Sequence, residues 1–220
     1  MGAGALLLLA AALVATAPPA AAQSTSATAT APAAVNPNDP AAYKCFELCD
    51  KLGIKNIHVH KGPTILPLNK DAFDVHDVDY AATDFQNLNW IIEHCGLPRL
   101  DDFCWIATQE PNVYGGLAVA LPFIHTRPRY FAEVIAELLF WIGPDKILFG
   151  SDYAIWTPKW LVEKFWNFQL PEDIAAERGV QLTDEIKEKI LGLNAARLYG
   201  IDVAAKRAEL AQSPVRIAAE

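Results

Sequence analysis

Short apolar runs that stop at a polar residue alternate along this chain with longer segments of helical periodicity. The clearest run, residues 147–149, follows the polar stretch 143–146 and closes on Gly150, which is typical of a fully buried strand. Similar runs end at His60 and at His94, each of them close to a glycine. A fourth strand is expected over residues 113–119, where a double glycine indicates a bulge or a close backbone approach.

The segments between these runs predict helices. Apolar residues recur every three or four positions most strongly over residues 129–142. Helices are also expected over residues 40–52, 78–85, 100–108, 158–168 and 183–198, whereas residues 170–179 are expected to form a loop or a short turn. Helices of this length between successive strands indicate right-handed crossovers and a parallel sheet, so the fold class is α/β.

The number of strands limits the architecture. A closed (β/α)8 TIM-type barrel needs eight strand–helix units and about 200–250 residues. This chain predicts four strands within residues 39–203. The sequence therefore predicts either half of a barrel or an open four-stranded sheet.

The regions outside this domain differ in composition. Residues 1–22 are signal-peptide-like: an apolar core precedes the small residues 20–22, and the core is shorter than the roughly 18–20 residues that span a bilayer. No Lys or Arg precedes the core, so a mispredicted start in an alanine-rich genome stays open. Residues 23–38, rich in Ala, Ser, Thr and Pro, are expected to form a disordered linker, and residues 204–220 a C-terminal tail.

Composition limits the classes of partner molecule but does not decide between the cytoplasm and export. The 220 residues are 52% hydrophobic, enough for one core, and the net charge of −8 without a basic cluster argues against nucleic acid and membrane surfaces. No membrane span is expected. The four cysteines are scattered and are expected to be buried free thiols rather than a disulfide scaffold. Free thiols favour the cytoplasm, whereas the signal-like start favours export.

Five segments carry a resemblance to a known family. In chain order they are IHVHKG at 57–62, IEHCG at 92–96, EPNVY at 110–114, ILFGSDY at 147–153 and KILGLNAARLY at 189–199. Together they resemble the amidohydrolase-related family of metal-dependent hydrolases and non-oxidative decarboxylases, over residues 39–202. Ala154 stands where that family has a proline. The resemblance implies strands five to eight of a TIM-type barrel, that is, its C-terminal half.

The resemblance also implies roles for the residues at the strand ends. His60 and Asp152 correspond to metal ligands, and Asp152 also to a catalytic base. His94 corresponds to a catalytic residue beside the substrate, where it would polarise a carbonyl. Imidazole and carboxylate suit Zn2+, with Mn2+ as the alternative, and bound zinc lowers the pKa of water to about 7. The implied reaction is hydrolysis of a C–N, lactone or related bond in a small organic substrate, or a decarboxylation.

One departure from the family pattern affects the ligand set. The family's first strand supplies a His-x-His pair, but no histidine precedes His58 in this chain. Strands one to four are therefore expected to be missing, and His58 becomes a candidate third ligand because alternate strand residues face the same side. The alternative is that His58 and His60 are themselves the strand-one pair.

Further candidates and rival functions complete the prediction. Lys61, His125 and Arg127 are candidates for contacting an anionic substrate, with a surface loop as the alternative for His125. The first hypothesis is a metal-dependent hydrolase. The second is a non-catalytic half-barrel that acts as a binding module, as a homo-oligomer or with a complementing N-terminal half. The third is a truncated coding region, which an in-frame His-x-His sequence upstream of Met1 would reveal.

Overall fold

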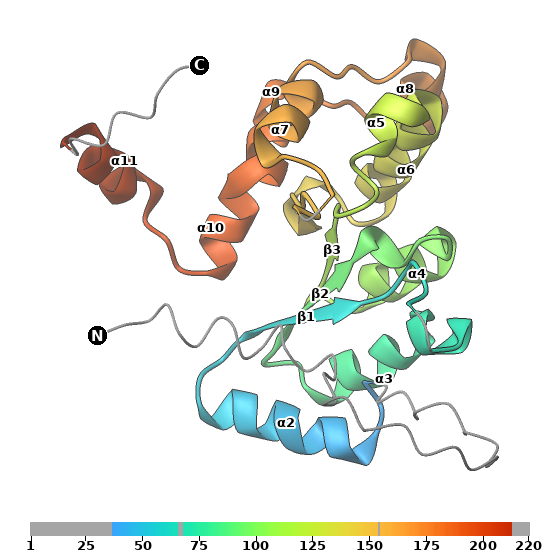
Figure 1. Ribbon diagram of the computed structural model, residues 1–220, viewed down its shortest axis with the longest axis vertical. Helices are drawn as coiled ribbons and strands as arrows, with labels where there is room; N and C mark the ends of the chain where they lie inside the picture. Colours follow the sequence, from blue (N-terminus) through green and yellow to red (C-terminus); the bar gives the residue numbers. More distant parts are fainter. Residues whose placement is uncertain (1–36, 66–67, 154, 213–220) are drawn as a thin grey trace, which may run out of the picture.

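The computed structural model describes residues 37–65, 68–153 and 155–212. The predicted leader and nearly all of the predicted linker lie outside the described residues. The described chain is built around one parallel sheet, with helices between its strands (Figure 1).

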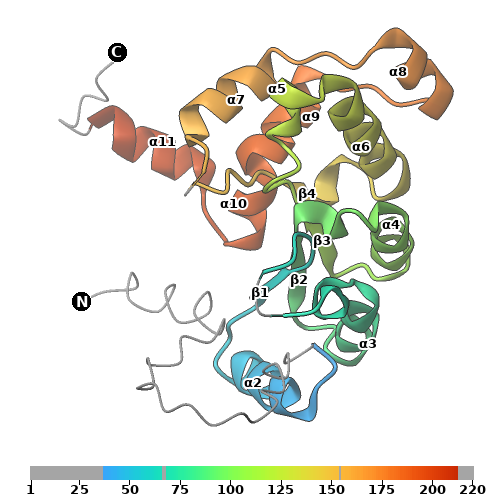
Figure 2. The same ribbon diagram turned by 45° about the vertical axis from the view of Figure 1, so that its right-hand side comes forward.

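The sheet has four strands in the order β1-β2-β3-β4, all parallel. They are β1 (Asn56–His60), β2 (Asn89–Glu93), β3 (Val113–Gly116) and β4 (Ile147–Leu148). Figure 2 shows β4 following β3 at the side of the sheet next to α10. Consecutive parallel strands joined by helices confirm the predicted α/β class and the partial TIM-type barrel. The third and fourth strands are shorter than predicted.

Helices separate the strands and follow the last one. The main helices are α2 (Pro40–Lys51), α3 (His76–Asp84), α4 (Leu100–Gln109), α6 (Pro128–Trp141), α7 (Pro158–Trp166), α8 (Glu172–Arg178) and α11 (Val203–Gln212). Shorter pieces are η1 (Lys70–Phe73), η2 (His94–Gly96), α5 (Phe123–Thr126), η3 (Pro144–Lys146), α9 (Asp184–Glu188), the π-helical η4 (Lys189–Leu193) and α10 (Asn194–Leu198). The predicted helix over 183–198 is therefore α9, η4 and α10 in succession.

Local sequence explains several helix boundaries. Asp39 caps α2 by accepting a hydrogen bond from the Ala41 amide, with proline at the first helical position. Thr183 caps α9 in the same way, accepting from the Ile186 amide. The prediction of a loop over 170–179 was wrong, because residues 172–178 form α8. Ion pairs from Arg129 to Asp173 and from Arg178 to Glu137 join this short helix to α6.

The two faces of the sheet differ sharply. Trp90 and Ile92 of β2 are fully buried and, with Ile57 and Val59 of β1, pack into the main apolar core. The alternate residues of β1 face the other way, and they are polar: Asn56, His58 and His60. The apolar face is the outer face of a barrel, covered by helices, and the polar face is the inner one.

Two asparagines from the family motifs stabilise the ends of elements. Asn112 donates to three backbone carbonyls, those of Ala82, Phe85 and Leu88, at 3.0–3.3 Å. Asn194 donates to the carbonyls of Pro144 and Ile147 at 2.7 and 2.8 Å. Each asparagine satisfies backbone carbonyls at the segment that leads into a strand, β2 for Asn112 and β4 for Asn194. These motif residues therefore have a structural role.

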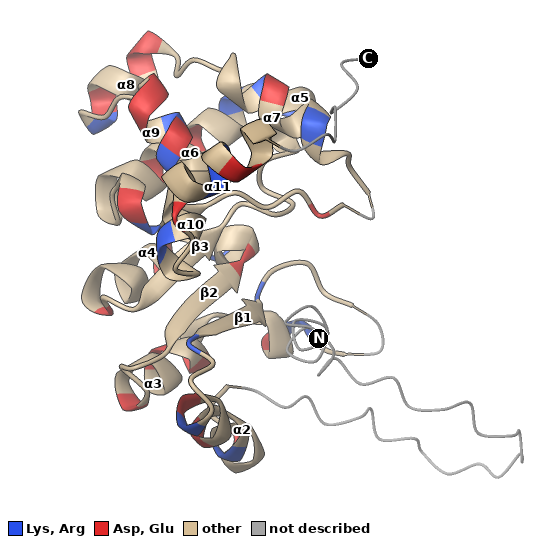
Figure 3. Cartoon of the chain, turned by 90° about the vertical axis from the view of Figure 1, so that its left-hand side faces the viewer, with Lys and Arg blue, Asp and Glu red and all other residues tan. Residues whose placement is uncertain are grey.

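The remaining observations concern the surface. Helix α11 covers the first part of the predicted tail, and none of its residues is buried. Acidic and basic residues are interspersed over the helices in the view of Figure 3. Among the described residues, no helix combines the length and the apolar character needed to cross a bilayer.

The cysteines are free, as predicted, but Cys45 is exposed rather than buried.

Candidate functional site

His60 is the last residue of β1, and the chain that follows the strand surrounds its ring. Its Nε2 donates to the Pro63 carbonyl oxygen at 2.9 Å. The Phe73 ring meets the imidazole edge-on, with ring centroids 5.3 Å apart. Nδ1 of His60 faces His94. Both the tautomer and the orientation of His60 are therefore set by the connection between β1 and α3.

His94 follows β2 directly and is 5% exposed. Its Nδ1 donates to the Ala118 carbonyl oxygen at 3.0 Å, just beyond β3. Its Nε2 lies 3.0 Å from Nδ1 of His60. Burial lowers the pKa of His94, although the hydrogen bond to Ala118 opposes this effect. The neutral ring is favoured, and its one N–H is already used on a carbonyl.

The two imidazoles form a pair that favours a cation between them. His60 and His94 each donate their outer N–H to a backbone carbonyl, so neutral rings would direct two lone pairs at each other across 3.0 Å. Such a contact is favourable only if a proton or a metal ion is shared between the nitrogens. Donation of the outer N–H to a carbonyl is the usual second-shell arrangement of metal-ligating histidines.

Left-handed backbone marks the same end of the sheet. Among the described residues, four non-glycine positions have positive φ: His94 (65°), Cys95 (50°), Val119 (61°) and Asp152 (53°). All four lie within a few residues of the ends of β2, β3 or β4. A β-branched residue in this conformation is unusual, and strained backbone gathers at functional sites. The observed strain supports a functional site at the carboxyl ends of the strands.

Asp152 reaches the same end of the sheet from β4. Its carbonyl accepts hydrogen bonds from the amides of Ile155 and Trp156, at 2.9 and 3.4 Å, which fixes a tight turn after the strand. Its carboxylate is close enough to act electrostatically on His94, where it raises the pKa. The structure therefore brings His60, His94 and Asp152 to one end of the sheet.

His58 lies on the same face as His60, but other groups engage it. Its Nδ1 lies 2.6 Å from the Glu93 carboxylate and its Nε2 lies 2.7 Å from the Tyr199 hydroxyl. With both ring nitrogens bonded, His58 has no free lone pair for a metal in this arrangement. Glu93 and Tyr199 were not predicted as site residues. The alternation of β2 could have indicated Glu93, but no sequence signal places Tyr199 beside β1.

The three candidates for substrate contact have other partners in the structure. The Lys61 ammonium is buried and pairs with Asp77 at 2.8 Å, so it is not available to a substrate. The His125 ring stacks on Trp160, and the Arg127 guanidinium lies 4.4 Å above the Tyr130 ring.

The residues at the strand ends fit a divalent ion in their donor chemistry and orientation. His60 Nδ1 and His94 Nε2 offer two imidazole nitrogens that backbone carbonyls already orient, and Asp152 offers a carboxylate after β4, which β3 separates from β2. Within the described parts of the chain, no group of three or more His, Cys, Asp or Glu side chains is arranged to hold a metal. The structure thus contains an oriented pair of imidazoles, and the Asp152 carboxylate is not yet grouped with them.

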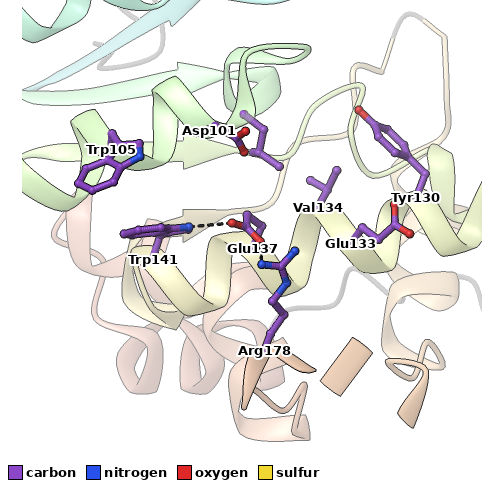
Figure 4. Close-up of a pocket in the computed structure, with 9 residues that line it drawn as sticks. Asp101, Trp105, Tyr130, Glu133, Val134, Glu137, Trp141 and Arg178 are labelled. Carbon is purple, nitrogen blue, oxygen red and sulfur yellow. Dashed lines mark hydrogen bonds and ion pairs between the residues drawn. The ribbon is translucent and has the colours of Figure 1, made fainter. Parts of the chain in front are cut away.

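A cavity lies elsewhere. It measures about 480 Å³ and is lined by residues of α4, α6 and α8, including Trp105, Trp141 and Arg178 (Figure 4). Glu137 bonds both the Trp141 indole and the Arg178 guanidinium there. None of the candidate site residues lines this cavity. The strand-end chemistry, rather than the cavity, therefore identifies the candidate site.

Replacing Gly150 with alanine is predicted to disturb this site. An added Cβ would lie 2.7 Å from the Ala118 amide nitrogen and 2.9 Å from its Cβ, so the backbone that orients His94 would have to move. We expect a loss of about 1–3 kcal/mol in unfolding free energy, measured by urea denaturation. Gly192→Ala is the matched control, because nothing lies within 4 Å of its added Cβ and helical alanine is preferred. Equal stability of the two variants would contradict the contact.

The fold and the site together define a class. Four parallel strands in sequential order, helices on the outer face and imidazoles at the carboxyl ends of the strands form part of a TIM-type α/β barrel. The family model described as Amidohydrolase matches residues 28–201. The chain belongs to the amidohydrolase family.

Solved structures show the same fold. An uncharacterised TIM-barrel protein from Bordetella bronchiseptica is 20% identical, with a TM-score of 0.57 over 76% of this chain and 53% of its own. A zinc-bound amidohydrolase from Burkholderia multivorans is 16% identical (TM-score 0.51; 76% and 59%). A dihydroxybenzoic acid decarboxylase from Polaromonas, with bound manganese and an inhibitor, is 16% identical (TM-score 0.50; 76% and 56%). No curated protein matches at a significant level. The chain spans a little over half the length of these structures.

Proposed function

We propose that this chain carries the metal-binding end of an amidohydrolase-type enzyme that acts on a small organic substrate. The observation that carries the proposal is the His60–His94 pair, whose inner nitrogens lie 3.0 Å apart while both outer nitrogens donate to carbonyls. His60, His94 and Asp152 would hold Zn2+ or Mn2+, the ions that the structural relatives contain. His58 stays a secondary candidate, because it must first leave Glu93 or Tyr199.

The chemistry follows from the residues at the strand ends. A bound divalent ion supplies Lewis-acid polarisation and a water whose pKa is lowered to about 7. Asp152, whose carboxylate acts electrostatically on His94, would accept a proton from the attacking group. Among rival reactions, hydrolysis of an amide or lactone and decarboxylation of a dihydroxybenzoate both suit this arrangement, and the second is the reaction for which the Polaromonas decarboxylase is named.

Metal content tests the proposal directly. We expect about one zinc or manganese ion per chain after dialysis against trace metal, and clear loss in both His60→Ala and Asp152→Ala. Mass spectrometry of the metals in the purified full chain provides the measurement. His76→Ala is the control, because this exposed histidine pairs with Asp74 and is not one of the candidate ligands. Metal no higher than in the two site variants would mean that the site does not bind a metal in this chain.

The non-catalytic reading is favoured by a different observation. Among the described residues, strand β1 has a neighbour on one side only, and the inner face of the sheet carries polar side chains such as His58, whose side chain is 44% exposed. An unpaired strand edge is a surface for further strand pairing. In this second proposal the chain pairs with a complementing N-terminal half-barrel or with its own copy. A monomeric mass in multi-angle light scattering across the micromolar range would exclude self-association.

A further inference from the structure

A buried ion pair sits directly beside the candidate site. Lys61 follows His60 in the chain, and its ammonium lies 2.8 Å from a carboxylate oxygen of Asp77, in the first turn of α3. The Lys61 side chain is 1% exposed and that of Asp77 is not exposed at all. The ammonium also donates to the Ala72 carbonyl at 3.1 Å. One side chain thus joins the end of β1 to η1 and to α3.

One of the segments joined in this way, η1, contacts the His60 ring. Ala72 precedes Phe73, whose ring packs edge-on against the imidazole. On the other side, Pro63 accepts the hydrogen bond from His60 Nε2. Between them, Gly62 approaches His94 so closely that a Cβ there would lie 2.9 Å from the His94 Cβ. Lys61 stands between His60 and Gly62 in the chain, and its ammonium bonds the residue before Phe73.

An ion pair is a poor choice if stability alone is needed. Two buried charges lose their hydration, and apolar residues of similar size in their place are often as stabilising or more so. A paired ammonium instead constrains the positions of its neighbours, because it donates hydrogen bonds to particular acceptors, here Asp77 and Ala72. This pair therefore suits the orientation of neighbouring groups.

We propose that Lys61 and Asp77 form a positioning pair that holds Pro63 and Phe73 against His60 and so fixes the orientation of its imidazole in the site. The part of this inference that concerns metal affinity rests on the proposed function. The part that concerns the ring itself does not. The two residues act through His60 and are not themselves ligands.

The test compares the full chain with Lys61→Met/Asp77→Leu, which replaces the pair by apolar side chains of similar size. Long-range proton–nitrogen NMR spectra of the five imidazoles, recorded without metal, report which His60 nitrogen carries the proton. In the parent chain we expect Nε2 of His60 to carry a fixed proton, whether or not its Nδ1 also shares a proton with His94, and in the double variant we expect averaged nitrogen shifts. Zinc affinity, measured by competition with a chelator, should fall by about tenfold, as for other second-shell losses.

Control variants separate positioning from stability. Lys187→Met removes another buried lysine, one that donates to the Trp166 carbonyl, and should change neither the His60 spectrum nor the zinc affinity. If the double variant does not fold, Asp77→Asn keeps an acceptor for Lys61 and should shift the His60 spectrum in the same direction by less. An unchanged His60 spectrum in the variant that folds overturns the proposal. If the parent chain binds no zinc, the proposed function fails while the NMR result still decides this inference.

Discussion

Lys61→Met alone should be among the most destabilising single substitutions in the chain. It leaves the Asp77 carboxylate without its partner at a position with no solvent exposure, and one oxygen of that carboxylate already has no hydrogen-bond partner. Removing one member of a buried ion pair costs about 3–5 kcal/mol. Chemical denaturation monitored by circular dichroism measures the loss. The Lys61→Met/Asp77→Leu double variant should recover most of it, and failure to recover would mean that the pair stabilises the fold by more than charge compensation.

The same variant should have a distinctive pH dependence. Burial raises the pKa of Asp77, and the attraction of Lys61 opposes the rise. A carboxyl whose folded pKa is raised binds protons more readily in the folded state, so stability is lost as pH rises from its ordinary pKa through the raised one. Without Lys61 the pKa rises further. The deficit of Lys61→Met relative to the parent chain should therefore shrink as the pH is lowered from neutral toward about 4, while that of Lys187→Met stays nearly constant.

Sequence patterns predicted the sheet because each strand is a short apolar run with a clear end. Periodicity also located α6, where the apolar spacing is strongest. It missed α8, whose one buried side chain, Ile174, packs against Ala132 and Ala136 of α6, and whose ion pairs to α6 are exposed or partly exposed. The local sequence pattern gives little indication of a helix that is stabilised mainly by contacts with another helix. The end of β4 was overextended for a related reason: only Ile147 and Leu148 find partners on β3, although the apolar run continues to Phe149.

For the site, the sequence could predict which residues reach the strand ends but not what they contact. His60 and His94 were identified from the strand ends and the family motifs, and the structure places them 3.0 Å apart. The partners of His58 lie 35 and 141 positions away in the chain, so only the fold brings them together. Lys61 looked like a substrate contact because it adjoins His60. Its burial depends on Asp77, sixteen positions later, at a point where the chain turns back over the strand end.

Asn112→Asp should be at least as damaging as the loss of Lys61, although it changes one atom. The Asn112 amide group donates to the carbonyls of Ala82, Phe85 and Leu88 and is 6% exposed. A carboxylate there cannot donate and would face three carbonyls. The Phe85 carbonyl still accepts from the Leu88 amide, but those of Ala82 and Leu88 would lose the Asn112 donor, and a buried acceptor left unsatisfied costs about 1–3 kcal/mol. We expect a loss of more than about 3 kcal/mol, seen as a large drop in the urea midpoint. Asn167→Asp is the control, since this exposed asparagine donates to a single carbonyl, that of Glu163, and should lose less than about 1 kcal/mol. Equal losses at the two positions would show that the hydrogen bonds of Asn112 do not hold the entry to β3, and the PNVY motif would need another explanation.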